Sequence, residues 1–548
     1  MLPTLPTARD LRDSQGMRVR RLGLGVVVVV AVVACRRRDP AAGADGASPL
    51  VTPSKTTVGD PASHPVVSGP PGFVAFPGAE GFGAAATGGR GGRVLYVTTL
   101  APRGPGSLQE ALDAEGPRTI LFRVSGRIEG VPIVSRGDVT IAGQSSPGGI
   151  TLRGLLIQGD VVCEGPSAPE CPTPKLAPKN FVVRHLRIRP GKFDDPNGAG
   201  DGLRLHHAKL GVVDHVSIGN AADEAVQISF SSDVTIQRSI FAETLGEHAE
   251  FGGMLVNYSD PARGAPLTRL TVHHNVWNRI FGRLPEVSRE NVPDAGTMDL
   301  EVSANLYWDP RRPAYVAASN PQDGKKLAYR INWVGNASVQ DPAQPRCFGL
   351  FGVEGGPDPS RPSFFPGTSV YVAKNSVSRS SRTDLELVYG SDDFCAEDKA
   401  DALPLANAGP KRPAWAAASR HPFPAVTYPA DEKALARELY ATAGAFPRDP
   451  LDRRVMRNVA DGTFDKAPID KNPARDTDGL PFASPPAPPL DTDGDGMPDT
   501  WEAANGLDPK SPADGALTTL SPKRLGVAGY TNLEVYLEER SREVMRGM

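Results

Sequence analysis

The chain has 548 residues, including 58 glycines and 54 prolines, and only 6% of its residues are aromatic. This composition predicts a large, turn-rich, all-β domain with an appendage. The 60 basic and 63 acidic residues leave a net charge of −3, which excludes a generally polycationic protein and makes nucleic acid a poor partner. Binding of an anionic polymer would therefore need a local basic groove.

Residues 1–35 are predicted to be an export signal. Three arginines precede an apolar run at residues 22–33, which is too short to cross a bilayer and ends just before Cys35. This order resembles a bacterial lipoprotein signal. We expect a lipid on Cys35, which would be the only contact of the protein with the membrane. The expected location is the bacterial cell envelope or surface, and release of the protein to the outside is the alternative. The alternative is a membrane anchor. Residues 36–72 are predicted to form a flexible linker.

The other four cysteines are an even number in a chain predicted to leave the cytosol, so disulfides are permitted. Cys163 and Cys171 bracket a short loop and are predicted to close it, which leaves Cys347 and Cys395 as the second pair. Four free thiols are the alternative. No Cys-x-x-Cys spacing indicates a zinc site.

The folded part is predicted to begin at Phe73 with glycine-rich segments, followed by Ser107 as the N-cap of a short capping helix. Short apolar stretches then recur at unequal intervals, at residues 139–141, 181–183, 212–213, 234–236, 270–272, 300–302 and 370–372.

Unequal coils of this kind suit a parallel β-helix, in which each turn stacks on the last. Asn275, Asn305 and Asn375 follow such stretches at the same offset, so their amides are expected to stack and to satisfy backbone groups in a turn. A β-sandwich is the alternative, but its hairpins would need Asn-Gly or Asp-Gly turns between strands of similar length.

Residues 201–283 carry acidic positions beside short β-type stretches, and an arginine follows late in the segment. The acids include Asp201, Asp223 and Glu224, and the arginine is Arg283. Carboxylates with a late arginine predict a metal site with a cationic partner.

Five blocks in this order resemble the pectate lyase family: Asp201-Gly-Leu, Val213-Asp-His215, Asp223-Glu224, His273-His274-Asn275 and Arg283-Leu-Pro285. The resemblance covers residues 73–480, including a closing segment at 434–466, and Gly202 stands where the family has alanine. It implies an all-β fold, a right-handed single-stranded parallel β-helix with short capping helices.

The resemblance also implies calcium-dependent β-elimination of polygalacturonate or a related uronate polymer, an acidic plant-type polysaccharide. Asp201 and Asp223 match the family's calcium ligands. Glu224 is expected to help complete the shell, because Gln227 stands where many members have a third ligand. Arg283 matches the catalytic arginine, taken to act as the base.

Other positions have secondary roles in this prediction. Asp214, His215 and the remaining histidines of the coil turns (His206, His207, His273 and His274) are expected to be structural. Glu250 stands where many members have a lysine that grips the uronate, so this position departs from the family's substrate-binding pattern.

Four arginines are candidates for substrate binding. Arg187 and Arg189 alternate along a strand and could face one groove, where they would bind sugar carboxylates. The alternative for this pair is a solvated ladder paired to Asp194 and Asp195. Arg279 and Arg289 are expected to lie beside Arg283.

Residues 481–490 form a Pro-rich linker, and residues 491–548 are predicted to be a small calcium-binding tail, EF-hand-type and dockerin-like. Oxygen ligands occupy loop positions 1, 3, 5, 9 and 12, with Gly496 at position 6 where the backbone must turn. The predicted ligands are Asp491, Asp493, Asp495, Asp499 and Glu502. We expect one calcium ion that is structural and separable from catalysis; a solvated acidic linker is the alternative.

The leading functional prediction is therefore a calcium-dependent lyase acting as a monomer. One alternative is a β-helix glycoside hydrolase, which needs paired carboxylates as acid and base and whose Gly-His-Gly and Arg-Ile-Lys signatures are absent. The other is a non-catalytic carbohydrate-binding β-helix, which Gln227 and Glu250 motivate.

Overall fold

A computed structural model describes residues 73–547 except for internal gaps, and all of these residues belong to the unit Ala62–Met548. The gaps are residues 164–170, 192–199, 245–251, 291–295, 321–322, 344–349, 359–361, 379, 383, 391–411, 468 and 470–483. The predictions on Cys35, the first linker, Asp194, Asp195, Glu250, Cys347 and Cys395 lie outside the described residues.

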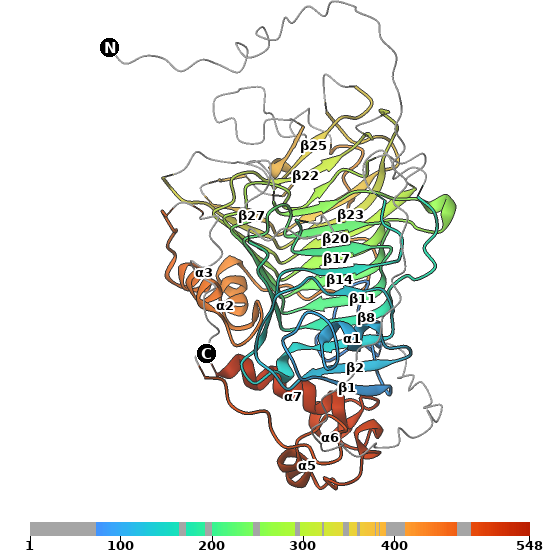
Figure 1. Ribbon diagram of the computed structural model, residues 1–548. Helices are drawn as coiled ribbons and strands as arrows, with labels where there is room; N and C mark the ends of the chain where they lie inside the picture. Colours follow the sequence, from blue (N-terminus) through green and yellow to red (C-terminus); the bar gives the residue numbers. More distant parts are fainter. Residues whose placement is uncertain are drawn as a thin grey trace, which may run out of the picture. The chain divides into compact units, whose positions relative to one another are not determined.

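The strands form three sheets, which we name A, B and C (Figure 1). Sheet A contains β1 (Arg93–Val97), β2 (Arg118–Phe122), β5 (Val139–Ala142), β8 (Lys179–Arg184), β11 (Lys209–Asp214), β14 (Ser232–Gln237), β17 (Thr268–His273), β20 (Thr297–Ser303), β23 (Ala328–Val334) and β26 (Ser369–Ala373). Sheet B contains β3 (Gly126–Ile128), β6 (Ile150–Leu152), β9 (Leu186–Ile188), β12 (Ser217–Gly219), β15 (Ile240–Ala242), β18 (Val276–Asn278), β21 (Leu306–Trp308), β24 (Ala337–Val339) and β27 (Ser376–Val377). Sheet C contains β4 (Ile133–Val134), β7 (Leu155–Gln158), β10 (Leu203–His206), β13 (Val226–Ser229), β16 (Met254–Val256), β19 (Glu286–Val287), β22 (Ala314–Ala317), β25 (Phe351–Glu354) and β28 (Val388–Gly390).

The order of these strands confirms the predicted parallel β-helix. The chain passes from sheet A to B to C and returns to sheet A beside its own previous strand, as β8, β9, β10 and β11 show. Every pairing between these named strands is parallel, whereas a sandwich built from hairpins would pair them antiparallel. Side chains at equivalent positions therefore lie above one another in successive coils.

The inward side chains form one continuous apolar core along the coils. Phe241, Trp277 and Tyr307 occupy equivalent positions in three successive coils, and their ring centroids are 4.6 and 5.7 Å apart. Stacking of large apolar side chains removes their surface from water and stabilises each coil against its neighbours.

A ladder of asparagine side chains lines the turn between sheets A and B, as predicted. The Nδ2 atom of Asn275 donates to the Oδ1 atom of Asn305 at 3.0 Å, and the same contact links Asn336 to Asn375 at 3.0 Å. Asn336, which the prediction omitted, also accepts the Asn305 amide at 3.0 Å. Each amide also donates to a buried backbone carbonyl, as from Asn275 to Ile236, so the ladder satisfies turn groups that would otherwise be unpaired.

Residues 73–92 cross the outer face of sheet A, and this crossing explains their glycine-rich sequence. The amide of Phe82 donates to Thr271 Oγ1 at 3.0 Å, and that of Gly83 to Thr235 Oγ1 at 2.9 Å. A Cβ atom on Gly81 would lie 2.5 Å from Thr271 Oγ1, and one on Gly83 would lie 2.0 Å from a backbone oxygen of sheet A. Only glycine permits this close approach.

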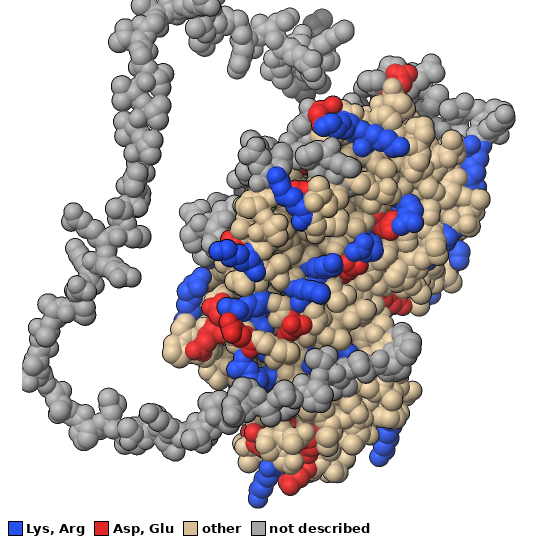
Figure 2. Space-filling model, turned by 90° about the vertical axis from the view of Figure 1, so that its right-hand side faces the viewer, with Lys and Arg blue, Asp and Glu red and all other residues tan. Residues whose placement is uncertain are grey.

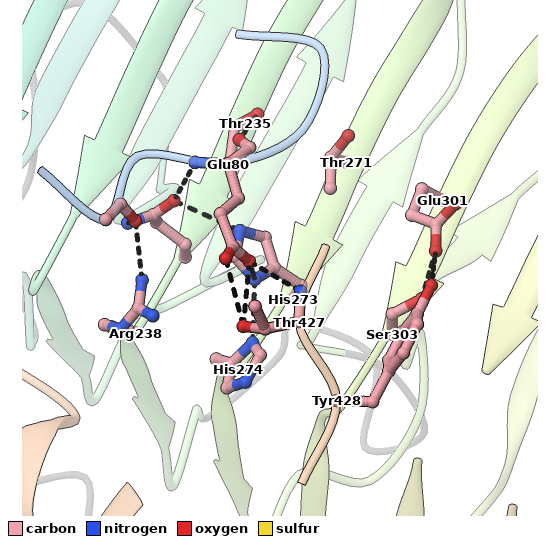
Figure 3. Close-up of polar contacts among 12 residues, drawn as sticks. Glu80, Thr235, Arg238, Thr271, His273, His274, Glu301, Ser303, Thr427 and Tyr428 are labelled. Carbon is pink, nitrogen blue, oxygen red and sulfur yellow. Dashed lines mark hydrogen bonds and ion pairs between the residues drawn. The ribbon is translucent and has the colours of Figure 1, made fainter. Parts of the chain in front are cut away.

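Figure 3 shows where this crossing segment meets a later part of the chain on sheet A. The carboxylate of Glu80 accepts hydrogen bonds from the amide and hydroxyl groups of Thr427, both at 3.0 Å, and lies beside His273. Next to it, the Tyr428 hydroxyl donates to Glu301 at 3.1 Å. Two segments far apart in sequence therefore cover sheet A together.

The helices occupy the ends and outer faces of the coils. They are α1 (Leu108–Asp113), α2 (Glu432–Thr442), α3 (Pro450–Asp461), α5 (Asp499–Asn505), α6 (Ser521–Leu525) and α7 (Asn532–Arg546), with short 3-10 turns η1 (Gly143–Ser145), η3 (Pro261–Arg263), η4 (Asp384–Leu387) and η6 (Asp514–Ala516). Ser107 caps α1 as predicted, because its hydroxyl accepts the amide of Glu110 at 3.2 Å.

The closing segment packs against sheet B. Leu439 of α2 and Val455 of α3 share an apolar cluster with Ile240, Val276 and Leu306 of sheet B. Sheets A and B thus have helices or crossing segments on their outer faces, and the residues Asp201, Asp223, Glu224 and Arg283 lie just before strands of sheet C.

The C-terminal tail packs on the first strands of sheet A. Leu533 and Leu537 of α7 cluster with Leu121 of β2 and Ala142 of β5. Helix propensity and loop spacing did not reveal which apolar surface α7 covers, and the expectation that the tail is separable from catalysis stays a prediction. No helix in the described part of the chain has the length and apolar content needed to span a membrane.

Candidate active site

Successive coils place a row of polar residues just before the strands of sheet C. Leu203 of β10 pairs with Leu155 of β7 and Val226 of β13, and Val226 pairs with Met254 of β16. The residues two positions earlier therefore share one level of the coils. Continued through β19 and β22, the row is Arg153, Asp201, Glu224, Gly252, Arg283 and Arg312.

Three of the predicted metal ligands come together at this row, two of them in it and Asp223 next to Glu224. Asp201, Asp223 and Glu224 each offer a carboxylate oxygen, and these oxygens lie within 4.8 Å of one another. The backbone amide of Glu224 also donates to Asp201 Oδ1 at 3.3 Å, which fixes the two coils against each other. Carboxylate oxygens at this separation could hold a hard divalent cation.

Arginines contact two of these carboxylates. Arg204 donates from Nε and Nη2 to Asp201 Oδ2, both at 3.2 Å. Arg283 contacts Glu224 through Nη1 and donates from Nε to Glu286 Oε2 at 2.9 Å. Arg283 is thus held between the carboxylate cluster and a second acid.

Sequence reasoning missed Arg204 and Glu286. Both lie in strands of sheet C, and Arg204 stands between two leucines whose side chains enter the core, so strict alternation could have identified it as outward-facing. Burial raises the pKa of Glu286, and the Arg283 guanidinium opposes that rise.

Two glycines lie beside Arg283 in the coil. A Cβ atom on Gly252, which stands between Glu224 and Arg283 in the row, would lie 2.4 Å from Thr244 Oγ1. The carbonyl of Arg283 accepts the amide of Met254 at 2.6 Å, and a Cβ atom on Gly253 would lie 2.0 Å from that same carbonyl oxygen. The pair Gly252-Gly253 is therefore a positioning element that the sequence prediction did not include.

The structure also explains why Gly202 departs from the family's alanine. A Cβ atom at Gly202 would lie 2.4 Å from Ile218 Cγ2 and 2.8 Å from the Ala225 carbonyl oxygen. Gln227, at the position of the missing third ligand, pairs in register with Arg204 and Leu255. Its Oε1 atom is buried and has no hydrogen-bond partner among the described residues.

The prediction that Arg187 and Arg189 bind substrate is wrong, and so is the solvated ladder. Both side chains are fully buried. Arg187 donates to the carbonyl of Pro447 at 2.6 Å, and Arg189 contacts Asp449 and Asp452, both at 2.9 Å. The alternation correctly indicated outward-facing side chains, but on sheet B, where the closing segment covers them.

The prediction for Arg279 and Arg289 is also wrong. Arg279 is 6% exposed and pairs with Glu243 at 2.7 Å. Arg289 is fully buried and donates to the carbonyls of Gly296 and Ala328, both at 3.2 Å. Proximity in sequence to Arg283 did not place either guanidinium in the row, because these contacts hold both side chains elsewhere in the coils.

Asp214 and His215 have the structural role that was expected. Asp214 is fully buried and accepts from Arg184 Nε at 2.8 Å and from Gln237 Nε2 at 2.8 Å, and His215 Nδ1 lies 2.6 Å from it. The charged partners hold the pKa of Asp214 well below its ordinary value, although burial alone would raise it.

The turn histidines are held by contacts within the coils. His206 contacts the backbone of Cys163, and burial lowers its pKa to about 3. Glu80, His273 and His274 lie close enough to hold a metal, yet Glu80 accepts from Thr427. These contacts explain, without a bound metal ion, why Glu80, His273 and His274 lie together.

The disulfide between Cys163 and Cys171 is confirmed, with Cα atoms 5.6 Å apart. It packs with Phe230 and Tyr258 at the turn that leads from sheet C to sheet A. The bond therefore closes its loop beside His206, at one edge of the sheet that carries the site.

A second carboxylate group lies in the tail. Asp491, Asp493 and Asp495 offer oxygens within 4.8 Å of one another, and so do Asp495, Glu502 and Asp514. Asp514 was missed because it lies beyond the predicted loop. Asp499 lies outside both groups, since Thr492 donates to its two oxygens at 2.7 and 2.6 Å.

No protein-family profile matches the chain. A probable pectate lyase C from Aspergillus flavus is 31% identical over 477 residues, which cover 85% of this chain and 93% of the relative. A probable pectate lyase C from Aspergillus oryzae is also 31% identical over 477 residues, with the same shares of 85% and 93%. A solved pectate lyase from Bacillus sp. N165 in complex with trigalacturonate covers 67% of this chain and 98% of its own at 15% identity, with a TM-score of 0.41.

Proposed function

This chain belongs to the pectate lyase family of polysaccharide lyases, and from that premise we propose that it cleaves polygalacturonate or a related uronate polymer by calcium-dependent β-elimination. The observation that carries the proposal is the row at the edge of sheet C, in which three carboxylates lie within 4.8 Å of one another and Arg283 contacts one of them. The fungal relatives are named for pectate, and that substrate is proposed here for this chain.

The proposed calcium site consists of Asp201, Asp223 and Glu224. Three carboxylates that share a space of 4.8 Å fit a hard cation that prefers oxygen ligands. When bound there, calcium would neutralise the substrate carboxylate and so make the neighbouring C5 proton easier to remove. Gln227 supplies no charge to this shell, so we expect substrate oxygens and water to complete it.

Arg283 is proposed as the base that accepts the C5 proton while the C4–O bond breaks, the C4–C5 double bond forms and an acid or solvent protonates the leaving oxygen. Because the proton must first leave a guanidinium, whose solution pKa is very high, we expect turnover to increase toward alkaline pH. Glu224 belongs both to the carboxylate cluster and to the Arg283 ion pair. Binding of calcium by Glu224 would therefore weaken its ion pair with Arg283 and leave one side of the guanidinium facing the substrate.

The row itself suggests how the polymer lies. Arg153 and Arg312 flank the carboxylates and Arg283 at the same level of the coils, so they replace Arg187, Arg189, Arg279 and Arg289 as proposed contacts for uronate carboxylates. Basic and acidic side chains are interspersed on the face in Figure 2. Recognition of an anionic chain would accordingly depend on this local row and not on a general positive surface.

The test is to follow ultraviolet absorbance and new reducing ends together on polygalacturonate, with calcium and with excess chelator. We expect both signals to rise with calcium and neither to rise with chelator or in Arg283→Ala. Reducing ends without absorbance would indicate hydrolysis, and binding of polymer without either signal would indicate a non-catalytic protein. Either outcome would overturn the proposal.

The finer predictions on location remain proposals. We propose a lipid on Cys35, attachment at a bacterial cell envelope, and a monomer, with catalytic residues confined to 73–480. Cys35→Ala should move the protein from the membrane fraction to the soluble fraction while the specific activity stays unchanged. Equal membrane association of the two proteins would contradict the anchor.

A further inference from the structure

The carboxylates of the tail point oxygens without partners into one buried space. Asp493 and Asp495 each hold the loop backbone with Oδ1, at 3.2 and 2.9 Å, and leave a buried Oδ2 without a hydrogen-bond partner among the described residues. Asp514 likewise accepts the Asp508 amide with Oδ2 at 3.2 Å, and its Oδ1 has no partner in the described part of the chain. Glu502 is fully buried, and neither of its oxygens has a partner among the residues that the structure describes.

Such an arrangement favours a bound cation. Burying a carboxylate without a partner is unfavourable, and four converging carboxylates would repel one another in the folded protein. Oxygen ligands in this number, from a loop with glycine at its sharp turn, suit Ca²⁺. Here the ligand set ends with Asp514 from η6, and Asp499 instead caps the loop through Thr492.

The same loop contacts the β-helix. Asp491 accepts the hydroxyl of Tyr96 in β1 and lies 3.5 Å from Arg123, just after β2. A Cβ atom on Gly496 would lie 2.9 Å from Leu121 of β2 and 2.7 Å from Leu533 of α7. The loop is therefore held between the first coils and the last helix.

Two buried ion pairs extend this contact along α7. Arg90 Nε donates to Glu534 at 2.7 Å, and Arg184 Nη1 donates to Glu538 at 3.0 Å. The guanidinium of Arg184 also donates to Ser541 at 3.2 Å. The tail thus covers sheet A from β1 to β8.

We propose that a Ca²⁺ ion held by Asp491, Asp493, Asp495, Glu502 and Asp514 fastens the tail onto the first coils of the β-helix. The ion orders the loop from which Asp491 reaches β1, and the loop positions Leu533 and α7 over sheet A. The tail is then an integral part of the lyase domain's stability. This inference does not depend on the proposed catalytic chemistry.

The test measures thermal unfolding and hydrogen exchange of the full chain with Ca²⁺ and with chelator. An Asp223→Asn background removes the contribution of the groove site. We expect Ca²⁺ to raise the Tm and to increase protection in β1 and β2 as well as in α7. Asp514→Asn and Glu502→Gln should lose more than about half of the Tm rise, whereas the matched variant Asp499→Asn should keep most of it.

Three results would overturn the inference. The first is a Tm in the Asp223→Asn background that does not respond to Ca²⁺. The second is an Asp499→Asn variant that loses as much of the Tm rise as Asp514→Asn. The third is protection that changes in the tail but not in β1 and β2, which the comparison with and without chelator reveals even if a variant fails to fold. Absence of lyase activity would not affect any of these readouts.

Discussion

The two carboxylate clusters of this molecule differ in what faces their oxygens. The cluster of Asp201, Asp223 and Glu224 beside sheet C is called the groove cluster below. There, Arg204 contacts Asp201 and Arg283 contacts Glu224, so guanidinium groups already offset part of the negative charge. In the tail, buried oxygens of Asp495 and Glu502 face no partner among the described residues. The first arrangement lets a cation compete with arginines, and the second leaves a cation as the main source of compensation.

This difference suggests different uses for the two clusters. A groove cation that shares its ligands with arginines can bind together with the substrate and leave with the product. A tail cation enclosed by five acids is expected to stay bound and to stabilise the fold. The predictions below test each half of the comparison.

The largest effect is expected at the groove cluster. Asp223→Ala should abolish turnover, because it removes one of three carboxylates, while circular dichroism should remain unchanged because the coil core is apolar. Glu115→Gln, at a side chain that is 80% exposed, is the matched control and should behave as wild type. Undiminished activity of Asp223→Ala would place the metal elsewhere.

Arg283→Lys should lower kcat by roughly 10²–10⁴-fold, the usual cost of removing a general base. Lysine keeps the charge but loses the planar fork that contacts Glu224 and Glu286 together. Binding of polymer should persist, as measured by affinity electrophoresis. Arg263→Lys is the control, and near-full turnover of Arg283→Lys would assign the base to another residue.

Acid should destabilise the β-helix and not the tail through histidine protonation, because the tail contains no histidine. Burial lowers the pKa of His206 to about 3 and that of His274 to about 3, so the unfolded chain takes up protons below pH 6.5 that the folded chain does not. The free energy of unfolding should therefore fall as pH falls, by about 2 kcal/mol per histidine at pH 5. Urea unfolding at pH 7 and pH 5 measures this, and His206→Gln should reduce the difference.

The smallest effect is expected from making the groove more like the tail. Gln227→Glu adds a carboxylate at the position of the missing third ligand, so the calcium concentration for half-maximal activity should fall by about tenfold. Calcium titration of the initial rate measures it, with Gln158→Glu in β7 as the control. An unchanged calcium requirement would show that position 227 does not face the cluster.

Much of the β-helix and of the groove cluster could be predicted from the sequence because both depend on order along the chain. Asn275, Asn305 and Asn375 stack because equivalent coil positions repeat, and Asp201 and Glu224 meet for the same reason. Arg187 could not be placed in the same way, because alternation gives the side of a strand but not the segment that later covers it.

The tail shows a second limit. The spacing of the EF-hand-type loop grouped Asp491, Asp493, Asp495, Asp499 and Glu502, whereas the carboxylates that lie close together in the structure leave out Asp499 and include Asp514. Position in a loop does not reveal that Thr492 occupies the Asp499 oxygens, nor that η6 brings Asp514 back to the loop. Contacts between distant segments are set by tertiary packing and leave little local signal.

Residues 73–92 can dock on sheet A once Thr235 and Thr271 are made, but two of their contacts wait for much later parts of the chain. Glu80 bonds to Thr427, 347 residues later, and Arg90 bonds to Glu534, 444 residues later. At ribosomal speed that second interval lasts roughly 20 to 90 s, during which each coil can already stack on its neighbour. The first part of the domain to be synthesised is thus fully fastened only near the end of synthesis, and protease should cut residues 73–92 more readily in nascent chains arrested before residue 427 than in the full chain.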